Sequence, residues 1–163
     1  MIRTTATVLT ALAFAAPVFA ESHSMGDAEA GADAFSQCQT CHVVVDDEGN
    51  TLAGKTAKTG PNLYGVVGRQ AGTVEDFRYG KSLVEAGEAG LVWDEENMVA
   101  FLKDPKEFLR EYLDDDKARS KMSFKVRKDE DAINLAAFLA TFSPEMDDDD
   151  GEMEDTEEGT ATN

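Results

Sequence analysis

The stretch Cys38-Gln39-Thr40-Cys41-His42 decides the fold and contains both cysteines of the chain. Two thiols separated by two residues, with a histidine directly after them, form the attachment signature of a c-type haem. The thiols add across the two vinyl groups of the porphyrin, and the next residue lies under the iron, where an imidazole nitrogen can bind it. The sequence therefore predicts one haem c, covalently bound through Cys38 and Cys41, with His42 as an iron ligand.

A C-x-x-C pair also occurs in structural disulfides, in zinc sites and in thioredoxin-like redox centres. A structural zinc site requires about four ligands, whereas the chain has two cysteines and two histidines, and His23 lies in a polar stretch far from the motif. A thioredoxin-like motif follows a strand and opens a helix, whereas this one ends a run with helical spacing. Haem attachment is favoured, and a structural disulfide is the alternative that these arguments leave open.

Residues 1–20 have the pattern of a secretory signal peptide. Arg3 supplies the positive start, residues 8–16 are apolar, and Val18-Phe19-Ala20 is an acceptable cleavage site. A membrane anchor is the alternative, but the apolar part is too short to span a bilayer. We expect cleavage after Ala20, a flexible leader over residues 21–26, and a soluble product in a bacterial periplasm.

The chain carries 15 basic and 33 acidic residues, which gives a formal charge of −18 at pH 7. This acidity argues against binding to nucleic acid or to anionic membrane surfaces. From residue 145 onward there are ten acidic residues and no basic or aromatic one, so this segment cannot bury enough apolar surface to fold. We expect one domain over residues 27–144 and a disordered acidic tail over residues 145–163.

Helical spacing and turn residues predict an all-α domain with long loops. Asp27 can cap a first helix that runs to about Thr40, with Ala32 and Phe35 on its apolar side. Residues 43–92 are rich in glycine, lysine and turn residues and show little strand signal. A stretch of this length without regular structure is unusual, and a haem packed inside it would explain it.

Three more helices are predicted in the second half of the domain. Asp94 can cap a helix that stops before Pro105. Asp104-Pro105-Lys106-Glu107 has the pattern of a new start, with aspartate as cap and proline in the first turn. The last helix begins near Asp129, where acidic residues crowd the first turn, and it has a wide apolar surface. The inward side of the middle helix is expected to contain Phe108, Leu109, Tyr112 and Leu113.

The sixth position of the iron decides the function, and elimination points to a methionine. Beyond the signal, the candidates are His23, Met25, Met98, Met122, Met146 and Met153. The first two lie in the polar leader and the last two in the acidic tail, while Met98 sits in an apolar helical run where core packing is expected. Met122 stands in a polar loop just before the last helix. Its thioether sulfur is a soft, neutral ligand that favours ferrous iron.

With these residues identified, the chain resembles the class I cytochromes c, specifically the soluble bacterial proteins most like the mitochondrial one. The resemblance covers about residues 29–142 and rests on motifs that recur in order. They are Gly31 and Phe35, the C-x-x-C-H run, Gly60-Pro61-Asn62-Leu63, Gly65-Val66-Val67-Gly68-Arg69, Tyr79, Trp93, Lys121-Met122-Ser123-Phe124, and Leu135 with Phe138. The fold that this implies is a few helices and long loops wrapped around one covalently bound haem.

The resemblance also implies roles for individual residues. Pro61 would accept a hydrogen bond from the other ring nitrogen of His42 and so orient the imidazole. Arg69, Tyr79 and Trp93 are similar to the residues that hold the buried haem propionates. Ordinary core packing is the alternative for the two aromatic residues.

Two more positions resemble the family and three features depart from it. Gly31 is similar to the small residue that lets the first and last helices cross closely, and Phe124 looks like the aromatic residue at the haem edge. Phe101 stands where the family often has a tyrosine near the methionine sulfur. Residues 44–53 and 111–118 form longer loops, and the acidic tail has no counterpart in the mitochondrial type.

The first functional hypothesis is a soluble, monomeric electron carrier that passes single electrons through an exposed haem edge, with His/Met-ligated iron and no enzymatic activity. Six basic residues surround the proposed methionine ligand, where they could face an acidic partner rather than being scattered solvated side chains: Lys117, Arg119, Lys121, Lys125, Arg127 and Lys128. The resemblance implies membrane redox complexes as transient partners, without membrane insertion. A quinol-cytochrome c reductase is the implied donor and a terminal oxidase the implied acceptor; a photosynthetic reaction centre, a peroxidase or a dehydrogenase are alternatives.

A haem enzyme, such as a peroxidase or a protein that reacts with oxygen or nitric oxide, is the second hypothesis. It requires an open sixth position and a distal acid or base, and the body of the chain has no spare histidine. A haem-bearing subunit of a larger complex is the third, which the charged surface and the missing anchor disfavour. The acidic tail either keeps the protein soluble or folds back over the basic residues.

Overall fold

The computed structural model describes residues 24–143. The predicted signal peptide, His23, Met146, Met153 and the acidic tail lie outside the described residues. Within residues 24–143, no helix is long and apolar enough to cross a membrane.

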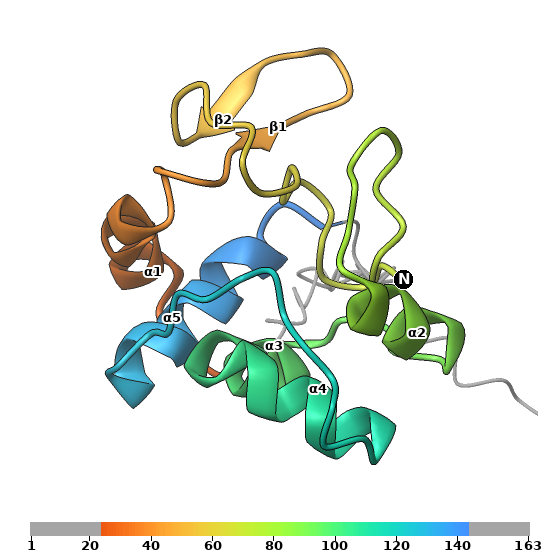
Figure 1. Cartoon of the computed structure of the whole chain (residues 1–163). Coiled ribbons are helices and arrows are strands. Elements are labelled where there is room, and N and C mark those ends of the chain that lie inside the picture. The colour runs from red at the N-terminus through yellow and green to blue at the C-terminus, as the bar shows by residue number, and fades with distance from the viewer. Residues whose placement is uncertain (1–23, 144–163) are drawn as a thin grey trace, which may run out of the picture.

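Helices dominate the described part of the chain (Figure 1). The elements are α1 (Ala28–Ala34), the 3₁₀ turn η1 (Phe35–Gln37), β1 (Val44–Val45), β2 (Thr51–Ala53), α2 (Lys81–Glu88), α3 (Glu95–Lys103), α4 (Pro105–Leu113) and α5 (Asp129–Ala140). Long loops connect β2 with α2 and α4 with α5. The predicted class of helices and long loops is confirmed.

Side-chain caps explain where three of these helices begin. The Asp27 carboxylate accepts hydrogen bonds from the backbone N–H groups of Glu29 and Ala30 at the start of α1. Asp94 forms a reciprocal capping box with Asn97 at the start of α3, and Asp104 caps α4 ahead of a proline in the first turn. These caps satisfy N–H groups that have no partner inside the helix, as the sequence predicts.

Two details of the helix predictions are wrong. The α-helix α1 ends at Ala34 and tightens into η1, so Phe35 is buried while Ala32 points to solvent. The spacing predicted Ala32 on the buried side of α1, but Gly31 lies there instead. The last helix, α5, approaches this position so closely that only a hydrogen atom fits. On α4, Tyr112 is 40% exposed while Leu109 is fully buried, so the buried stripe of this helix is narrower than predicted.

Two elements within residues 43–92 were not predicted. The short hairpin of β1 and β2 lies at one end of the molecule (Figure 1). Its turn is held by Asp46, whose carboxylate accepts hydrogen bonds from the backbone N–H groups of Glu48 and Asn50. The helix α2 contains Gly87, which packs so closely on the Ala71 backbone that a side chain would clash. Glycine lowers helix propensity, so local sequence hides this helix and tertiary packing stabilises it.

The crossing of α1 and α5 holds the two ends of the domain together. A Cβ atom on Gly31 would lie 2.7 Å from Phe138 Cβ and would clash with the backbone carbonyl of Asn134. The side chain of Asn134 in turn accepts a hydrogen bond from the Asp27 N–H at 2.9 Å. Next to the crossing, the rings of Phe35 and Phe138 pack with centroids 5.5 Å apart. The close helix crossing implied for Gly31 is present.

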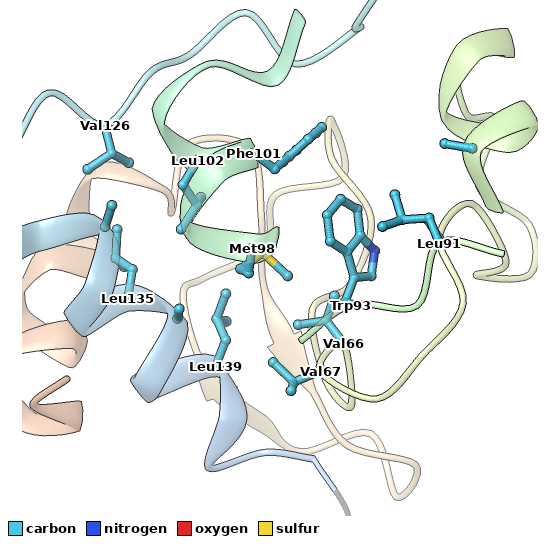
Figure 2. Packing of buried hydrophobic residues seen from close by; sticks show 14 of the residues in the cluster. Val66, Val67, Leu91, Trp93, Met98, Phe101, Leu102, Val126, Leu135 and Leu139 are labelled. Carbon is cyan, nitrogen blue, oxygen red and sulfur yellow. The ribbon is translucent and has the colours of Figure 1, made fainter. Parts of the chain in front are cut away.

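The hydrophobic core extends from this crossing to the loops (Figure 2). Met98 on α3 is buried, which confirms that it is a core residue. It lies between Leu139 of α5 and Trp93, the residue just before α3 (Figure 2). The core therefore joins the helices to the two loops that carry Arg69 and Trp93, one before α2 and one after it, and these loops build part of the site.

Candidate haem-binding site

The C-x-x-C-H residues form one tight turn at the end of η1. The N–H groups of Cys41 and His42 both donate to the Cys38 carbonyl, at 3.0 and 2.9 Å. Both cysteines are free thiols and partly exposed, so the disulfide alternative is not the arrangement seen. Burial, followed by the neighbouring Cys41, raises the pKa of Cys38 to about 11. The nucleophilic cysteine of a thioredoxin-like centre has a lowered pKa, so the pKa of Cys38 is shifted in the opposite direction.

The imidazole of His42 is oriented by the loop that carries Pro61. Its Nδ1 lies 3.0 Å from the Pro61 carbonyl oxygen. A carbonyl only accepts, so Nδ1 carries the hydrogen and the lone pair of Nε2 is available for a metal. Burial lowers the pKa of His42, with the Pro61 hydrogen bond opposing the shift. The ring is thus held neutral, which is the form that binds iron.

Gly60 allows this loop to approach the imidazole face. A Cβ atom there would lie 2.6 Å from His42 Nδ1 and 2.7 Å from Nε2. The Gly60 N–H also donates to the Cys41 carbonyl at 2.7 Å. The loop therefore contacts both the ring and the backbone of the C-x-x-C-H turn, and only glycine fits between them.

The structure brings the three predicted propionate-binding residues together. Arg69 and Trp93 are paired through the backbone, with the Trp93 N–H donating to the Arg69 carbonyl at 3.0 Å. Burial raises the pKa of Tyr79, while the nearby Arg69 charge and the Val74 backbone oppose the rise. Burial also lowers the pKa of Arg69. Arg69 and Tyr79 therefore lie close enough for their charges to interact, and Trp93 is joined to Arg69 through the backbone.

Arg69 and Trp93 have different surroundings. The Arg69 guanidinium donates to the carbonyls of Tyr64 and Asn62, at 2.7 and 3.3 Å. Trp93 is 6% exposed, and its ring packs against Phe101 and Phe108. Within residues 24–143, its indole N–H is not among the buried side-chain atoms that have no hydrogen-bond partner.

Met122 lies on a segment that we call the strap, residues 118–126. Its side chain is partly buried against the core. On one side of it, the Arg119 N–H donates to Ser82 Oγ at 3.1 Å and Lys121 Nζ donates to the Arg78 carbonyl at 2.6 Å. On the other side, the Val126 N–H donates to the Leu102 carbonyl at 2.9 Å. The strap is thus anchored on both sides of the methionine.

Sequence reasoning missed two polar residues that shape these loops. The side chain of Asn62 bridges to the neighbouring strand, accepting from the Val45 N–H at 2.9 Å and donating to the Val45 carbonyl at 2.6 Å. Ser82 is buried, and its hydroxyl accepts a hydrogen bond from the strap. Asn62 follows Pro61 in a quoted motif, which could have signalled its role. Nothing in the local sequence distinguishes Ser82.

Phe101 and Phe124, which the resemblance singled out, differ in burial: Phe101 lies in the core and Phe124 at the surface. Phe101 is buried and packs edge-on against Trp93, with ring centroids 5.0 Å apart. A tyrosine hydroxyl is therefore replaced here by an aromatic core contact. Phe124, beside Met122 on the strap, is 44% exposed, which suits a residue at the rim of a cofactor site.

The residues present fit a haem c. Two free thiols come from one turn, together with an imidazole whose Nδ1 is already hydrogen-bonded. A thioether lies on the anchored strap, and the arginine Arg69 lies near the tyrosine Tyr79. A zinc site lacks its ligands, because no group of three or more His, Cys, Asp or Glu side chains comes together in the described part. When bound, the haem supplies an iron that changes its charge by one electron.

Comparison with known proteins supports the same assignment. No model of a known protein family matches the chain. It is 62% identical over 115 residues to cytochrome c2 of Cereibacter sphaeroides, covering 70% of this chain and 93% of that protein. It is 56% identical over 143 residues to cytochrome c-551 of Roseobacter denitrificans, covering 88% of this chain and 97% of that protein.

Solved structures give the same result. The crystal structure of cytochrome c2 from Rhodobacter sphaeroides matches with a TM-score of 0.71 at 60% identity, covering 72% of this chain and 97% of that one. Ferric cytochrome c-550 from Paracoccus versutus matches with a TM-score of 0.69 at 42% identity, covering 73% and 99%. Proteins of this kind are periplasmic electron carriers. The chain belongs to the class I cytochromes c of the cytochrome c2 type, and it is an electron-transfer protein with one haem c on Cys38 and Cys41.

Proposed function

We propose that this chain carries one electron at a time with iron held between His42 Nε2 and the sulfur of Met122. The observation that supports this most strongly is the 3.0 Å contact from His42 Nδ1 to the Pro61 carbonyl. It fixes the imidazole and leaves one nitrogen free to bind the metal. Because both axial positions are filled by protein in this proposal, the iron has no open position for a substrate.

The anchored strap supports Met122 as the second ligand. Bonds to Ser82 and Arg78 precede the methionine and the Val126 bond follows it, so the sulfur can be held in place in both oxidation states. Electron transfer is fast when little has to move, and a preorganised ligand costs little reorganisation. The thioether also raises the reduction potential relative to a second histidine.

Arg69, Tyr79 and Trp93 are proposed to bind the haem propionates. Burying a carboxylate is costly unless it is paired and hydrogen-bonded. The Arg69 charge, the Tyr79 hydroxyl and the Trp93 N–H would offset that cost. The backbone bond between Trp93 and Arg69 and the closeness of Arg69 to Tyr79 support a joint role.

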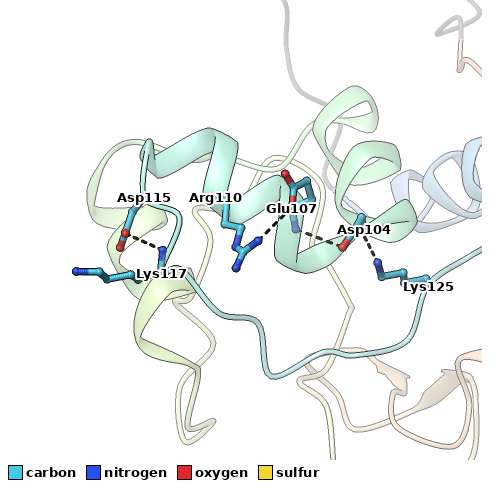
Figure 3. Close-up of polar contacts among 6 residues, drawn as sticks. All are labelled: Asp104, Glu107, Arg110, Asp115, Lys117 and Lys125. Carbon is cyan, nitrogen blue, oxygen red and sulfur yellow. Dashed lines mark hydrogen bonds and ion pairs between the residues drawn. The ribbon is translucent and has the colours of Figure 1, made fainter.

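The basic residues of the strap and its flanks are proposed to guide docking. All six are exposed, but their charges are not equally free. Lys125 pairs with Asp104 (Figure 3), and Lys128 lies 4.0 Å from Asp131. Transient partners require fast encounter more than affinity, so a local positive field on an acidic protein suits a partner with an acidic docking face. We infer a quinol-oxidising reductase as donor, and an oxidase or a reaction centre as acceptor.

The route to the periplasm is proposed from the amino-terminal sequence. Cleavage after Ala20 would give a mature chain that begins at Glu21, with a leader to residue 26, a domain to residue 144 and an acidic tail after it. Mass spectrometry of the exported protein tests this, because the mature mass identifies the first residue. A mass that retains Arg3 would exclude cleavage at this place.

Optical spectra of the purified holoprotein test the ligation. A low-spin c-type spectrum, a weak sulfur-to-iron band in the oxidised form and no reaction of the reduced form with carbon monoxide are expected. Met122→Leu should abolish the band and admit carbon monoxide. The matched control is Met98→Leu, the same change at a buried core position, which should keep the band. If Met122→Leu retained the band, another residue would hold the iron.

A further inference from the structure

A groove of about 430 Å³ lies between α3 and α4 and shares no lining residue with the strap. Its walls combine two aromatic rings with three carboxylates, those of Phe108, Tyr112, Asp94, Glu96 and Glu111. We call it the aromatic groove. No lysine or arginine of the described residues lines it. Aromatic surface and negative charge in one place favour an organic cation.

Tyr112 presents an aromatic ring that is exposed but held in position. It is 40% exposed, and its ring stacks on that of Phe108 with centroids 5.9 Å apart and an angle of 24° between the planes. Phe108 in turn packs on Trp93 and on Phe101, with centroids 6.0 and 5.7 Å away. This chain of rings ties Tyr112 to the core. Tyrosine is enriched at protein–protein interfaces, where a positioned ring gives contact area at low entropic cost.

The carboxylates of the aromatic groove are not neutralised from within. Asp94, Glu96 and Glu111 take part in none of the ion pairs formed within residues 24–143. The first two lie at the start of α3, where the helix dipole favours negative charge. Glu111 lies in the last turn of α4, where the dipole disfavours it. A cation bound in the groove would offset this charge.

The wall chemistry indicates which cation fits. A guanidinium group is planar, stacks on aromatic faces and pairs with carboxylates through a fork of N–H donors, whereas an ammonium group is a compact, strongly hydrated point charge. We propose that the aromatic groove binds an arginine side chain of a basic partner protein. The carrier then has two docking surfaces of opposite charge, the basic strap and the acidic groove. This assignment does not depend on which residues ligate the iron.

Amide NMR titration of the reduced holoprotein tests the site, at about 0.1 M salt so that charges more than roughly 10 Å apart are screened. The probe is a capped peptide with two arginines separated by glycine. The signals of Ala100, which also lines the groove, and of Glu111 and Tyr112 should shift to saturation. The same peptide with citrulline, which keeps the shape and removes the charge, should leave these signals in place. The lysine peptide and spermidine should each bind about threefold more weakly, because they lack the planar fork.

Four variants separate the groove from general charge effects. Tyr112→Leu should weaken binding of the arginine peptide about threefold, the loss of one exposed cation–π contact, whereas Tyr112→Phe keeps the ring and should stay within about twofold of the parent. Glu111→Gln should weaken binding about threefold. Asp47→Asn is its matched control, because it removes one exposed carboxylate from the turn between β1 and β2, at the opposite end of the molecule from α4 (Figure 1). Its affinity should equal that of the parent.

Three results would overturn the proposal. The first is a citrulline peptide that shifts the groove signals as strongly as the arginine peptide, because binding would then not depend on charge. Equal losses of affinity in Glu111→Gln and Asp47→Asn would show attraction to the acidic chain as a whole. Spermidine that binds more tightly than the arginine peptide would identify a free polyamine, and not a protein side chain, as the occupant.

Discussion

Replacing Gly60 with alanine should destabilise the holoprotein at the point where the proposed iron ligand is oriented. The added Cβ would lie 2.6 Å from His42 Nδ1 and 2.7 Å from Nε2, whereas ordinary contacts begin near 3.4 Å. The ring cannot retreat freely, because His42 directly follows Cys41 and its Nδ1 is bonded to Pro61. Either the imidazole turns and loses that bond, or the loop moves and loses the bond from the Gly60 N–H to Cys41.

The expected cost is a net loss of about 2 kcal/mol in the free energy of unfolding. Overpacking in a well-packed place costs about 1–3 kcal/mol, and the lost hydrogen bond adds about 1 kcal/mol. The alanine regains roughly 0.4–1 kcal/mol by restricting the unfolded chain. In a domain of this size, the net loss corresponds to a fall in Tm of roughly 8 °C.

Urea unfolding of the oxidised holoprotein, followed by circular dichroism and by the haem absorption, measures this cost. The matched control is Gly80→Ala, where the nearest atom to the new Cβ would be in the flexible Lys121 side chain, at 3.3 Å. Gly80 is also the N-cap of α2, where alanine is less favourable than glycine, so the control should lose less than about 1 kcal/mol. Equal stabilities for the two variants would refute the reasoning, because they would mean that the Gly60 loop does not press on the His42 ring.

Further predictions concern the helix crossing and the junction of α3 with α4. Gly31→Ala should lower the free energy of unfolding by about 2 kcal/mol, because its Cβ would clash with the Asn134 carbonyl. The control Ala32→Ser, on the exposed side of α1, should change the free energy of unfolding by less than about 0.5 kcal/mol. Similar values for both variants would contradict the close crossing of α1 and α5. The hydrogen bond from Lys125 lowers the pKa of Asp104, so its contribution to stability is present above the pKa of the unfolded carboxyl and is lost as the pH falls through the lower folded value. Asp104→Asn keeps the helix cap but loses the ion pair with Lys125. It should therefore lower the free energy of unfolding by at most about 0.5 kcal/mol at pH 7 and leave it unchanged near pH 2, as measured by urea unfolding at both pH values. A loss of stability that grew in acid would contradict the lowered pKa of Asp104.

Much of the site could be predicted because the residues that carry its chemistry lie close together in the sequence. The Cys38–His42 run specifies haem attachment through spacing alone, and covalent geometry places the imidazole relative to the thiols. Helix starts at Asp94 and Asp104 were also predictable, because a capping side chain bonds to N–H groups two or three residues away. These features depend on neighbours in the chain and not on the rest of the fold.

Other features could not be predicted because they depend on contacts between distant segments. Helical spacing alone placed Ala32 on the buried side of α1, whereas the approach of α5 buries Gly31, which only the family resemblance had indicated. The helix α2 contains Gly87, which local propensity disfavours but close packing on Ala71 requires. Ser82 acquires its role only when the strap is folded against it.

By itself, the sequence determined that this chain attaches a haem and that its body is helical, and it predicted Met122 as the second iron ligand. Only the tertiary structure decided that the Gly60 loop packs against the His42 ring, that Ser82 anchors the strap, and that Gly87 packs on Ala71. The reason is physical. Covalent spacing and capping are local and survive in any context, whereas close approach, burial and the loss of hydrogen-bond partners arise only when segments far apart in the chain are packed together.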